Sequence, residues 1–203
     1  MNQRITAVLI SLVMSLLLAG CLGGKTKYPA YYTLQVPPPP DPPRTEAARP
    51  KLAVRQFTSP GYLRQGAIVY RVSAEQIGFY DYHRWAVDPR EFVTNAIIDH
   101  LRAGNSFDDV KPYDGRTDVD YILSGRLEKL EELDYGGGVR VEVAMSAHIT
   151  SLKTGGTVWT NAVDVTEHVE GHNVAGVVSA MNAAMERSIE KLVSSQQIAQ
   201  VAH

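Results

Sequence analysis

The sequence predicts an α+β fold, a two-layer sandwich in which a mostly antiparallel sheet carries two helices on one face. Three observations support this prediction. Strand-like and helix-like segments follow one another in the order strands, helix, strands, helix. Over residues 139–150 every second residue is apolar, which is the period of a strand with one buried face. Over residues 174–193 an apolar stripe recurs at helical spacing and needs a sheet to cover it.

The predicted strands are stretches rich in aromatic and β-branched residues that turn-forming residues separate. They cover residues 31–36, 51–57, 67–71, 77–82, 121–127, 139–150 and 158–169. Residues 67–71 and 77–82 suit a hairpin or two adjacent strands, and 109–112 a short strand or a turn. The last three strands form a meander whose first turn is Gly136-Gly137-Gly138.

The first helix is predicted from its boundary residues. Asp88 can cap it, Pro89 suits the first helical position, and Glu91 completes a capping box. Gly104 is a natural end for this helix. Its apolar face, which includes Phe92, is expected to pack on the sheet.

The N-terminus has the pattern of a bacterial lipoprotein signal. Arg4 precedes an apolar run over residues 5–18, and the run ends in Leu18-Ala19-Gly20-Cys21. The small residues suit the signal peptidase, and the thiol of Cys21 would carry a diacylglycerol as a thioether, with an N-acyl chain on its amine. The alternative is an uncleaved anchor helix, but the run is shorter than the roughly 20 residues that span a bilayer.

The domain organisation follows from this motif. Residues 1–20 are predicted to be the signal peptide, 21–50 a lipidated tether with a strand and a Pro-rich segment, and 51–203 the folded α/β domain. The Pro-rich segment, 37–43, is expected to be a stiff spacer that sets the reach of the domain. No Asp follows Cys21 directly, which favours the periplasmic face of the outer membrane.

Composition argues against nucleic-acid binding and against a disulfide within the chain. The chain has 20 basic and 22 acidic residues, and this balance gives no electrostatic footprint for nucleic acid. Cys21 is the sole cysteine, so no disulfide can form within the chain once it is acylated. No non-covalent cofactor is predicted.

The best candidate for a binding surface is the aromatic and charged run over residues 80–85. Tyr, Trp and Arg are enriched at interface anchors. The candidate interface residues are Tyr80, Tyr82, His83, Arg84 and Trp85. In the alternative interpretation, the three aromatic residues support the following helix while the other two are solvated.

Candidates for catalysis or metal binding are weak. His168, Glu170 and His172 resemble a metal site in composition, but a strand ends there, and no further ligand that would complete a catalytic zinc site is identifiable. The chain has no G-x-S-x-G motif. The sequence therefore predicts neither a metal site nor an enzyme.

Several motifs, in order, resemble the ABC-type transport auxiliary lipoproteins, the PqiC-like family. The motifs are Tyr31-Tyr32-Thr33-Leu34, Ile68-Val69-Tyr70-Arg71, Phe79-Tyr80, His83-Arg84-Trp85-Ala86 with Pro89, Asp120 to Leu127, and Val158-Trp159. The resemblance implies a domain similar to the N-terminal domain of TolB.

The resemblance also implies an outer-membrane lipoprotein that works beside an ABC transporter and an MCE-domain protein in lipid transport between the two membranes. A homo-oligomeric ring is one arrangement it allows. Two other hypotheses stay open. One is an envelope assembly or scaffold lipoprotein that contacts peptidoglycan, lipopolysaccharide, or a Tol- or flagellum-type complex. The other is a lipid-modifying or cell-wall hydrolase.

Overall fold

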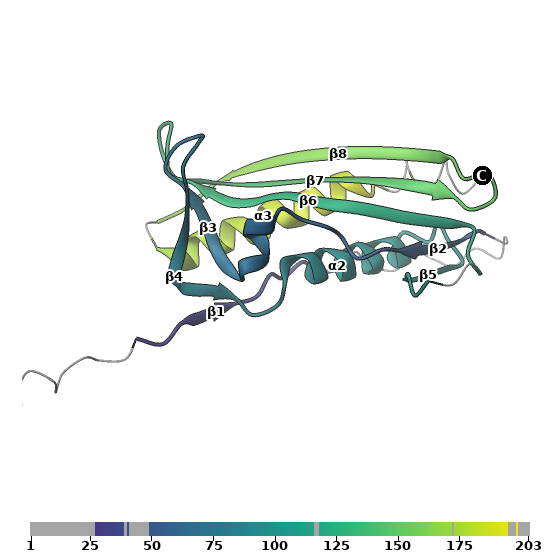
Figure 1. Ribbon diagram of the computed structural model, residues 1–203, viewed down its shortest axis with the longest axis horizontal. Coiled ribbons are helices and arrows are strands. Elements are labelled where there is room, and N and C mark those ends of the chain that lie inside the picture. The colour runs from purple at the N-terminus through teal and green to yellow at the C-terminus, as the bar shows by residue number, and fades with distance from the viewer. Residues whose placement is uncertain are drawn as a thin grey trace, which may run out of the picture.

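The computed structural model describes residues 27–38, 40, 49–115, 118–171, 173–194 and 198. Within these residues, an eight-stranded sheet carries two α-helices, α2 (Pro89–Ala103) and α3 (Val174–Leu192), and a short 3-10 helix, η1 (Gly61–Gln65). Both α-helices lie on the same side of the long strands (Figure 1). The predicted α+β sandwich is confirmed.

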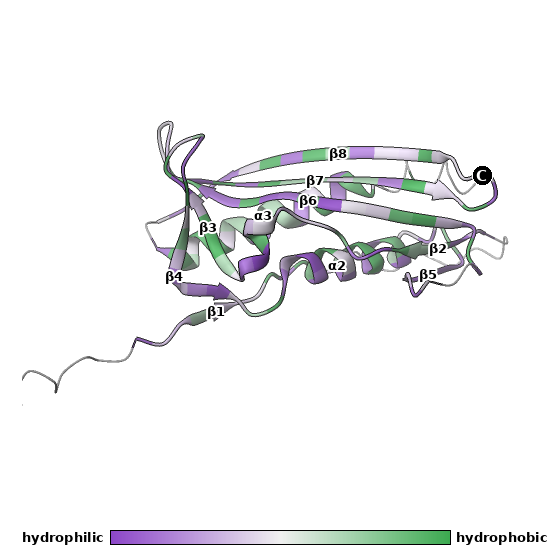
Figure 2. Cartoon of the chain, viewed as in Figure 1, coloured by the Kyte–Doolittle hydropathy of each residue, from purple (hydrophilic) through white to green (hydrophobic). Residues whose placement is uncertain are grey.

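Three long strands form one side of the sheet. They are β6 (Tyr121–Leu133), β7 (Arg140–Ser151) and β8 (Thr157–His168), and they pair as an antiparallel meander, as predicted, with β8 at the edge of the sheet. Apolar and polar residues alternate along them (Figure 2). The inward residues of β7 are buried as the period-two pattern predicts: Val141, Val143, Met145, Ala147 and Ile149.

Two short groups of strands share the other edge of β6. Near the start of β6 lies β2 (Lys51–Val54), with β5 (Asp109–Pro112) beyond it. Near its end lies β3 (Ala67–Arg71), followed by β4 (Ile77–Trp85) and β1 (Ala30–Tyr32). The short pairings with β6 are parallel, so the sheet as a whole is mixed.

The two groups define opposite ends of the elongated domain (Figure 1). We call the end formed by β2, β5 and the β7–β8 turn the β5 end. The end formed by β1, β3, β4 and the β6–β7 turn is the β4 end. The β6–β7 turn contains the predicted glycines, and Gly136, Gly137 and Gly138 all have positive φ angles.

The first strand belongs to the folded domain. β1 pairs in parallel with His83–Trp85 of β4, and Leu34, just after β1, is 7% exposed and lies in the core. The strand expected within the tether of residues 21–50 thus packs against the folded domain. The Pro-rich segment follows β1 in the chain and connects it to β2.

The core lies between the sheet and the helices. Met181, Met185 and Ile189 of α3 are fully buried, in agreement with the predicted stripe. The ring of Phe57 lies against Gly125 of β6, where a Cβ atom would come within 2.2 Å of the ring.

The ends of α2 are close to those predicted. The Asp88 side chain accepts a hydrogen bond from the backbone N–H of Arg90 (2.9 Å), and the last helical residue is Ala103. Gly104 remains right-handed at φ −67°, and the left-handed position falls on Asn105 at φ 53°. In the described part of the chain, no helix combines the length and the hydropathy needed to cross a bilayer.

Candidate functional site

Strand β4 turns different residues toward the inside and the outside of the sheet. Its pairing with β3 is irregular, because Ala67 lies opposite Arg84 while Val69 lies opposite Phe79. The extra residues on β4 break the simple alternation. Sequence pattern alone therefore does not tell which aromatic side chains of β4 are exposed.

Tyr80 points inward, to a buried carboxyl group. Its hydroxyl donates a hydrogen bond to Oε2 of Glu132 on β6 (2.8 Å), and Glu132 is 5% exposed. Burial raises the pKa of the Glu132 carboxyl above its ordinary value, and the hydrogen bond from Tyr80 opposes this shift. Burial, followed by the hydrogen bond to Glu132, raises the pKa of Tyr80.

Tyr80 also belongs to a row of aromatic rings. Its ring centre lies 5.1 Å from that of Tyr70 and 5.6 Å from that of His83, with edge-to-face geometry in both pairs. The hydroxyl of Tyr32 on β1 lies 3.0 Å from Nδ1 of His83. His83 thus lies between Tyr32 of β1 and Tyr80 of β4, and Tyr80 in turn contacts Tyr70 of β3.

A shallow hollow of about 360 Å³ adjoins Tyr80. Its wall combines acidic and amide groups with valine side chains and is formed by Tyr80, Glu132, Asp134, Val139, Val169, Gly171, Asn173, Val174 and Val177. No group of three or more His, Cys, Asp or Glu residues that could hold a metal ion occurs among the residues described.

Tyr82 and Arg84 lie on the exposed side of β4. Tyr82 is 40% exposed, and the Lys27 ammonium lies 4.4 Å from the centre of its ring. Arg84 is partly exposed, donates a hydrogen bond to the Gln65 carbonyl oxygen (3.2 Å) and pairs with Tyr31 of β1. Tyr31 is 63% exposed.

Trp85 is a core residue. Its side chain is 6% exposed and packs within the main hydrophobic cluster, and its backbone N–H donates to the Gly66 carbonyl oxygen (2.8 Å). Trp85 therefore supports the fold, as in the alternative interpretation. Of the five candidate interface residues, Tyr82 and Arg84 lie on the exposed side of β4.

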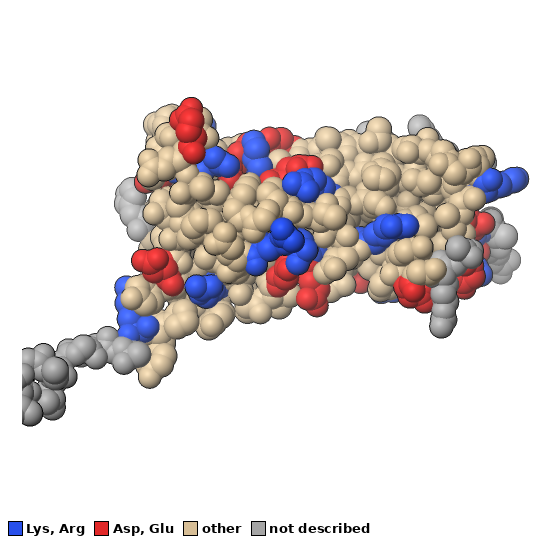
Figure 3. Space-filling model, viewed as in Figure 1, with Lys and Arg blue, Asp and Glu red and all other residues tan. Residues whose placement is uncertain are grey.

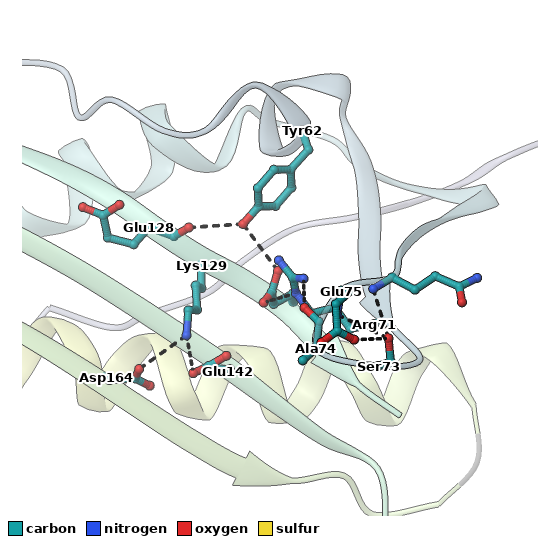
Figure 4. A network of polar contacts seen from close by, with 11 residues as sticks. Tyr62, Arg71, Ser73, Ala74, Glu75, Glu128, Lys129, Glu142 and Asp164 are labelled. Carbon is teal, nitrogen blue, oxygen red and sulfur yellow. Dashed lines mark hydrogen bonds and ion pairs between the residues drawn. The ribbon is translucent and has the colours of Figure 1, made fainter. Parts of the chain in front are cut away.

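A second polar network includes Tyr62 and Arg71, which lie over β6 (Figure 4). Glu131 is 1% exposed, and its Oε1 accepts a hydrogen bond from Nε of Arg71 (2.6 Å). The Tyr62 hydroxyl of η1 lies over the same strand and donates to Glu131 (3.4 Å). The hydrogen bond to Glu131 raises the pKa of the Arg71 guanidinium.

The remaining predicted site residues are not part of this surface. The motif Leu18, Ala19, Gly20 and Cys21 lies outside the described residues, as does His172. His168 ends β8 and Glu170 follows it, and both are exposed.

The sequence prediction missed the partners of β4. Tyr31 and Tyr32 join it through the parallel pairing of β1 with β4. Lys27 joins it through its contact with the Tyr82 ring, and Glu132 of β6 through its hydrogen bond with Tyr80. The tyrosines at 28, 31 and 32 were the available signal. Nothing local in the sequence indicated that they lie beside residues 82–85.

Solved structures share this fold. A protein from Xanthomonas campestris superposes with a TM-score of 0.72 at 16% sequence identity, and the match covers 85% of this chain and 97% of that chain. A second crystal structure, of an uncharacterized protein, gives a TM-score of 0.63 at 16% identity over 86% of this chain and 98% of the other. Among curated proteins, none matches the sequence.

A match between the sequence and a family model shows which family the chain belongs to. The chain belongs to the family described as ABC-type transport auxiliary lipoprotein component, whose model matches residues 32–193. The matched region begins within β1 and ends just after α3. Membership in this family assigns the chain to the membrane-anchored lipoproteins of the cell envelope, and to the auxiliary components of ABC-type transport.

Proposed function

We propose that this protein is a non-enzymatic component of an ABC- and MCE-type system that transports lipid between the inner and outer membranes. The observation that carries the proposal is the family match over residues 32–193. The protein acts by docking and positioning. Acylated Cys21 holds the domain at the periplasmic face of the outer membrane, and the exposed side of β4 contacts a neighbour.

The geometry of the N-terminus supports a positioning role. β1 begins at Ala30 and is fixed in the sheet by its pairing with β4. From Cys21 to Ala30 is a path of nine residues, which spans at most roughly 30 Å. An anchor at Cys21 therefore keeps the β4 end of the domain close to the membrane surface.

Affinity purification tests the proposed partners. The acylated protein is purified from membranes solubilised in a mild detergent, and an MCE-domain protein and the transporter subunits are expected to co-purify. Recovery of a peptidoglycan-bound or Tol-type complex without an MCE-domain protein would contradict the proposal and favour an envelope scaffold.

Removal of the anchor tests the positioning role. Cys21→Ala, or an ordinary secretory signal in place of residues 1–21, should leave the domain folded and abolish function. A version that is soluble in the periplasm and fully active would contradict the requirement for the anchor.

A further inference from the structure

We infer that the exposed side of the β4 end lies on the membrane and contacts phospholipid headgroups. The contact surface is a tyrosine–cation patch made of Lys27, Tyr28, Tyr31, Tyr82 and Arg84. The inference deepens the proposed function, on which it rests, because it names the neighbour that this side of β4 contacts. Its observations are independent of the family match.

The patch is assembled by the pairing of two distant segments. Tyr31 lies opposite Arg84 in the parallel register of β1 with β4. One step before Tyr28, the Lys27 ammonium lies 4.4 Å from the centre of the Tyr82 ring. The pairing therefore gathers these aromatic and basic side chains at one end of the domain.

The tyrosines of the patch are unusually exposed. Tyr28 is 81%, Tyr31 63% and Tyr82 40% exposed. Single exposed apolar residues are common on protein surfaces. Here, however, Tyr31 and Tyr82 lie on paired strands, and Tyr28 follows Lys27, whose ammonium contacts the Tyr82 ring. Tyrosine combines an apolar ring with a polar hydroxyl, which suits the depth of the headgroups.

The charges of the patch suit phosphate groups. Lys27 and Arg84 provide two cations. Asp81, the exposed acidic residue of β4, provides one opposing charge, so the cations are in excess. Figure 3 shows basic side chains, in blue, at the end of the domain where Figure 1 places β1. Each cation near an anionic surface strengthens membrane binding about fivefold.

The position of the anchor favours lipid over a protein partner. Only six residue steps separate Cys21 from Lys27, a distance of at most roughly 20 Å in extended chain. The patch thus contains the described residues that are nearest to Cys21 along the chain. The opposite end of the domain, at Leu152 in the β7–β8 turn, is separated from the β6–β7 turn at the β4 end by the twelve residues of β7, or roughly 40 Å.

Fluorescence quenching on vesicles tests the inference. The acylated full chain is reconstituted into vesicles of phosphatidylethanolamine and phosphatidylglycerol that contain a lipid with a quencher on its headgroup. The sulfur of Cys21 is consumed in the thioether, so an introduced cysteine is the sole free thiol. Ala30→Cys places the dye within β1 and keeps all patch side chains, and Leu152→Cys is the matched control at the β5 end.

We expect the headgroup quencher to reduce the emission of the dye at position 30 at least twofold and to leave that at position 152 unchanged. Equal quenching at both positions, or no quenching at position 30 on vesicles that retain the protein, would overturn the inference. So would a dye at position 30 that responds to an added MCE-domain protein and not to lipid. Before the fluorescence is read, flotation of the vesicles shows whether the protein is bound to them. If the protein does not float with the vesicles, the result contradicts the proposed anchor at Cys21 and not the contact through the patch.

A second measurement uses the chain without acyl groups. The mature chain that begins after Cys21 should bind the same vesicles weakly, and Lys27→Gln with Arg84→Gln should lower its partition coefficient about 25-fold, or about fivefold for each cation. Lys153→Gln, in the turn at the β5 end, is the matched control and should have no effect. Equal losses in both variants would contradict a contact through the patch.

Discussion

The two ends of the domain share strand β6 but are stabilised differently. At the β5 end, Leu52 and Val54 of β2 are at most 1% exposed, and Phe57 packs against Gly125. At the β4 end, the same strand buries two carboxyl groups, Glu131 and Glu132. The β5 end thus depends on apolar packing, whereas the β4 end depends on specific polar pairs.

The difference arises from the path of β6. Its pairing with β7 shifts register between Leu127 and Lys129, so the inward residues change from odd to even positions along the strand. Glu131 and Glu132 then point to opposite faces, one toward Arg71 and the other toward Tyr80. Buried charged pairs fix an arrangement more than they add stability. We interpret the polar pairs as what holds β3 and β4, and with them the tyrosine–cation patch, in place.

The largest loss of stability is expected at Phe57, which follows β2 of the β5 end. Phe57→Ala removes a ring that is 1% exposed and leaves a cavity against Gly125, which should lower the free energy of unfolding by about 3–5 kcal/mol. Urea denaturation measures the change. A loss below about 1 kcal/mol would contradict the role given to the β5 end.

The next effect is expected at the buried ion pair of the β4 end. Arg71→Met leaves the Glu131 carboxylate buried with Tyr62 alone, and the loss should be about 2–3 kcal/mol, because Arg71 is 21% exposed and its charge is partly solvated. The double variant Arg71→Met/Glu131→Leu should recover most of the loss, since it removes the unpaired charge. Equal instability of the single and double variants would contradict the explanation that the loss comes from an unpaired buried charge.

A smaller effect, visible through pH, is expected at Glu132. Because burial raises its pKa in the folded protein above the ordinary value of 4.5, the folded protein binds this proton more tightly than the unfolded chain does. This contribution to stability is fully present below the unfolded pKa and is lost as pH rises through the folded pKa.

Comparison with Glu132→Gln isolates this group from the other carboxylates. Gln keeps an acceptor for the Tyr80 hydroxyl and does not titrate. As pH rises from about 4 to about 8, the wild type should lose stability relative to this variant, as measured by denaturation at each pH. A difference that stays constant with pH, or that changes in the other direction, would contradict the assignment.

The smallest effect on stability is expected at the tyrosine–cation patch. Tyr82→Ser and Lys27→Gln remove exposed side chains and should change the free energy of unfolding by less than about 0.5 kcal/mol. They should nevertheless weaken vesicle binding. A larger loss of stability would mean that these residues support β4 rather than face the lipid.

The sequence predicted the parts of the fold that depend on local pattern. Both α-helices, the meander and the buried side of β7 followed from periodicity and capping residues. The parallel pairing of β1 with β4 did not, because it joins residues about fifty positions apart and leaves no local signal. β6 extends past its predicted end at Leu127 because the register shift there breaks the alternation that defines a strand in sequence.

The sequence predicted which segment carries the candidate site, but not which side chains of that segment are exposed or which other segments lie beside it. The aromatic run over residues 80–85 does lie at a distinct end of the domain. Which of its side chains are exposed depends on the irregular pairing with β3, and this pairing turns Tyr80 toward Glu132 and buries Trp85. Tyr31 of β1, and Lys27 and Tyr28 just before it, could be assigned to the site only in three dimensions.

Hydrogen exchange on membranes tests the orientation of the domain most directly. Amide exchange in the acylated protein on vesicles is compared, by mass spectrometry, with exchange in the same chain without acyl groups in solution. We expect slower exchange over residues 28–32 and 80–87 on vesicles and unchanged exchange over 150–158. Protection of residues 150–158 with none at the β4 end would contradict a membrane-facing patch.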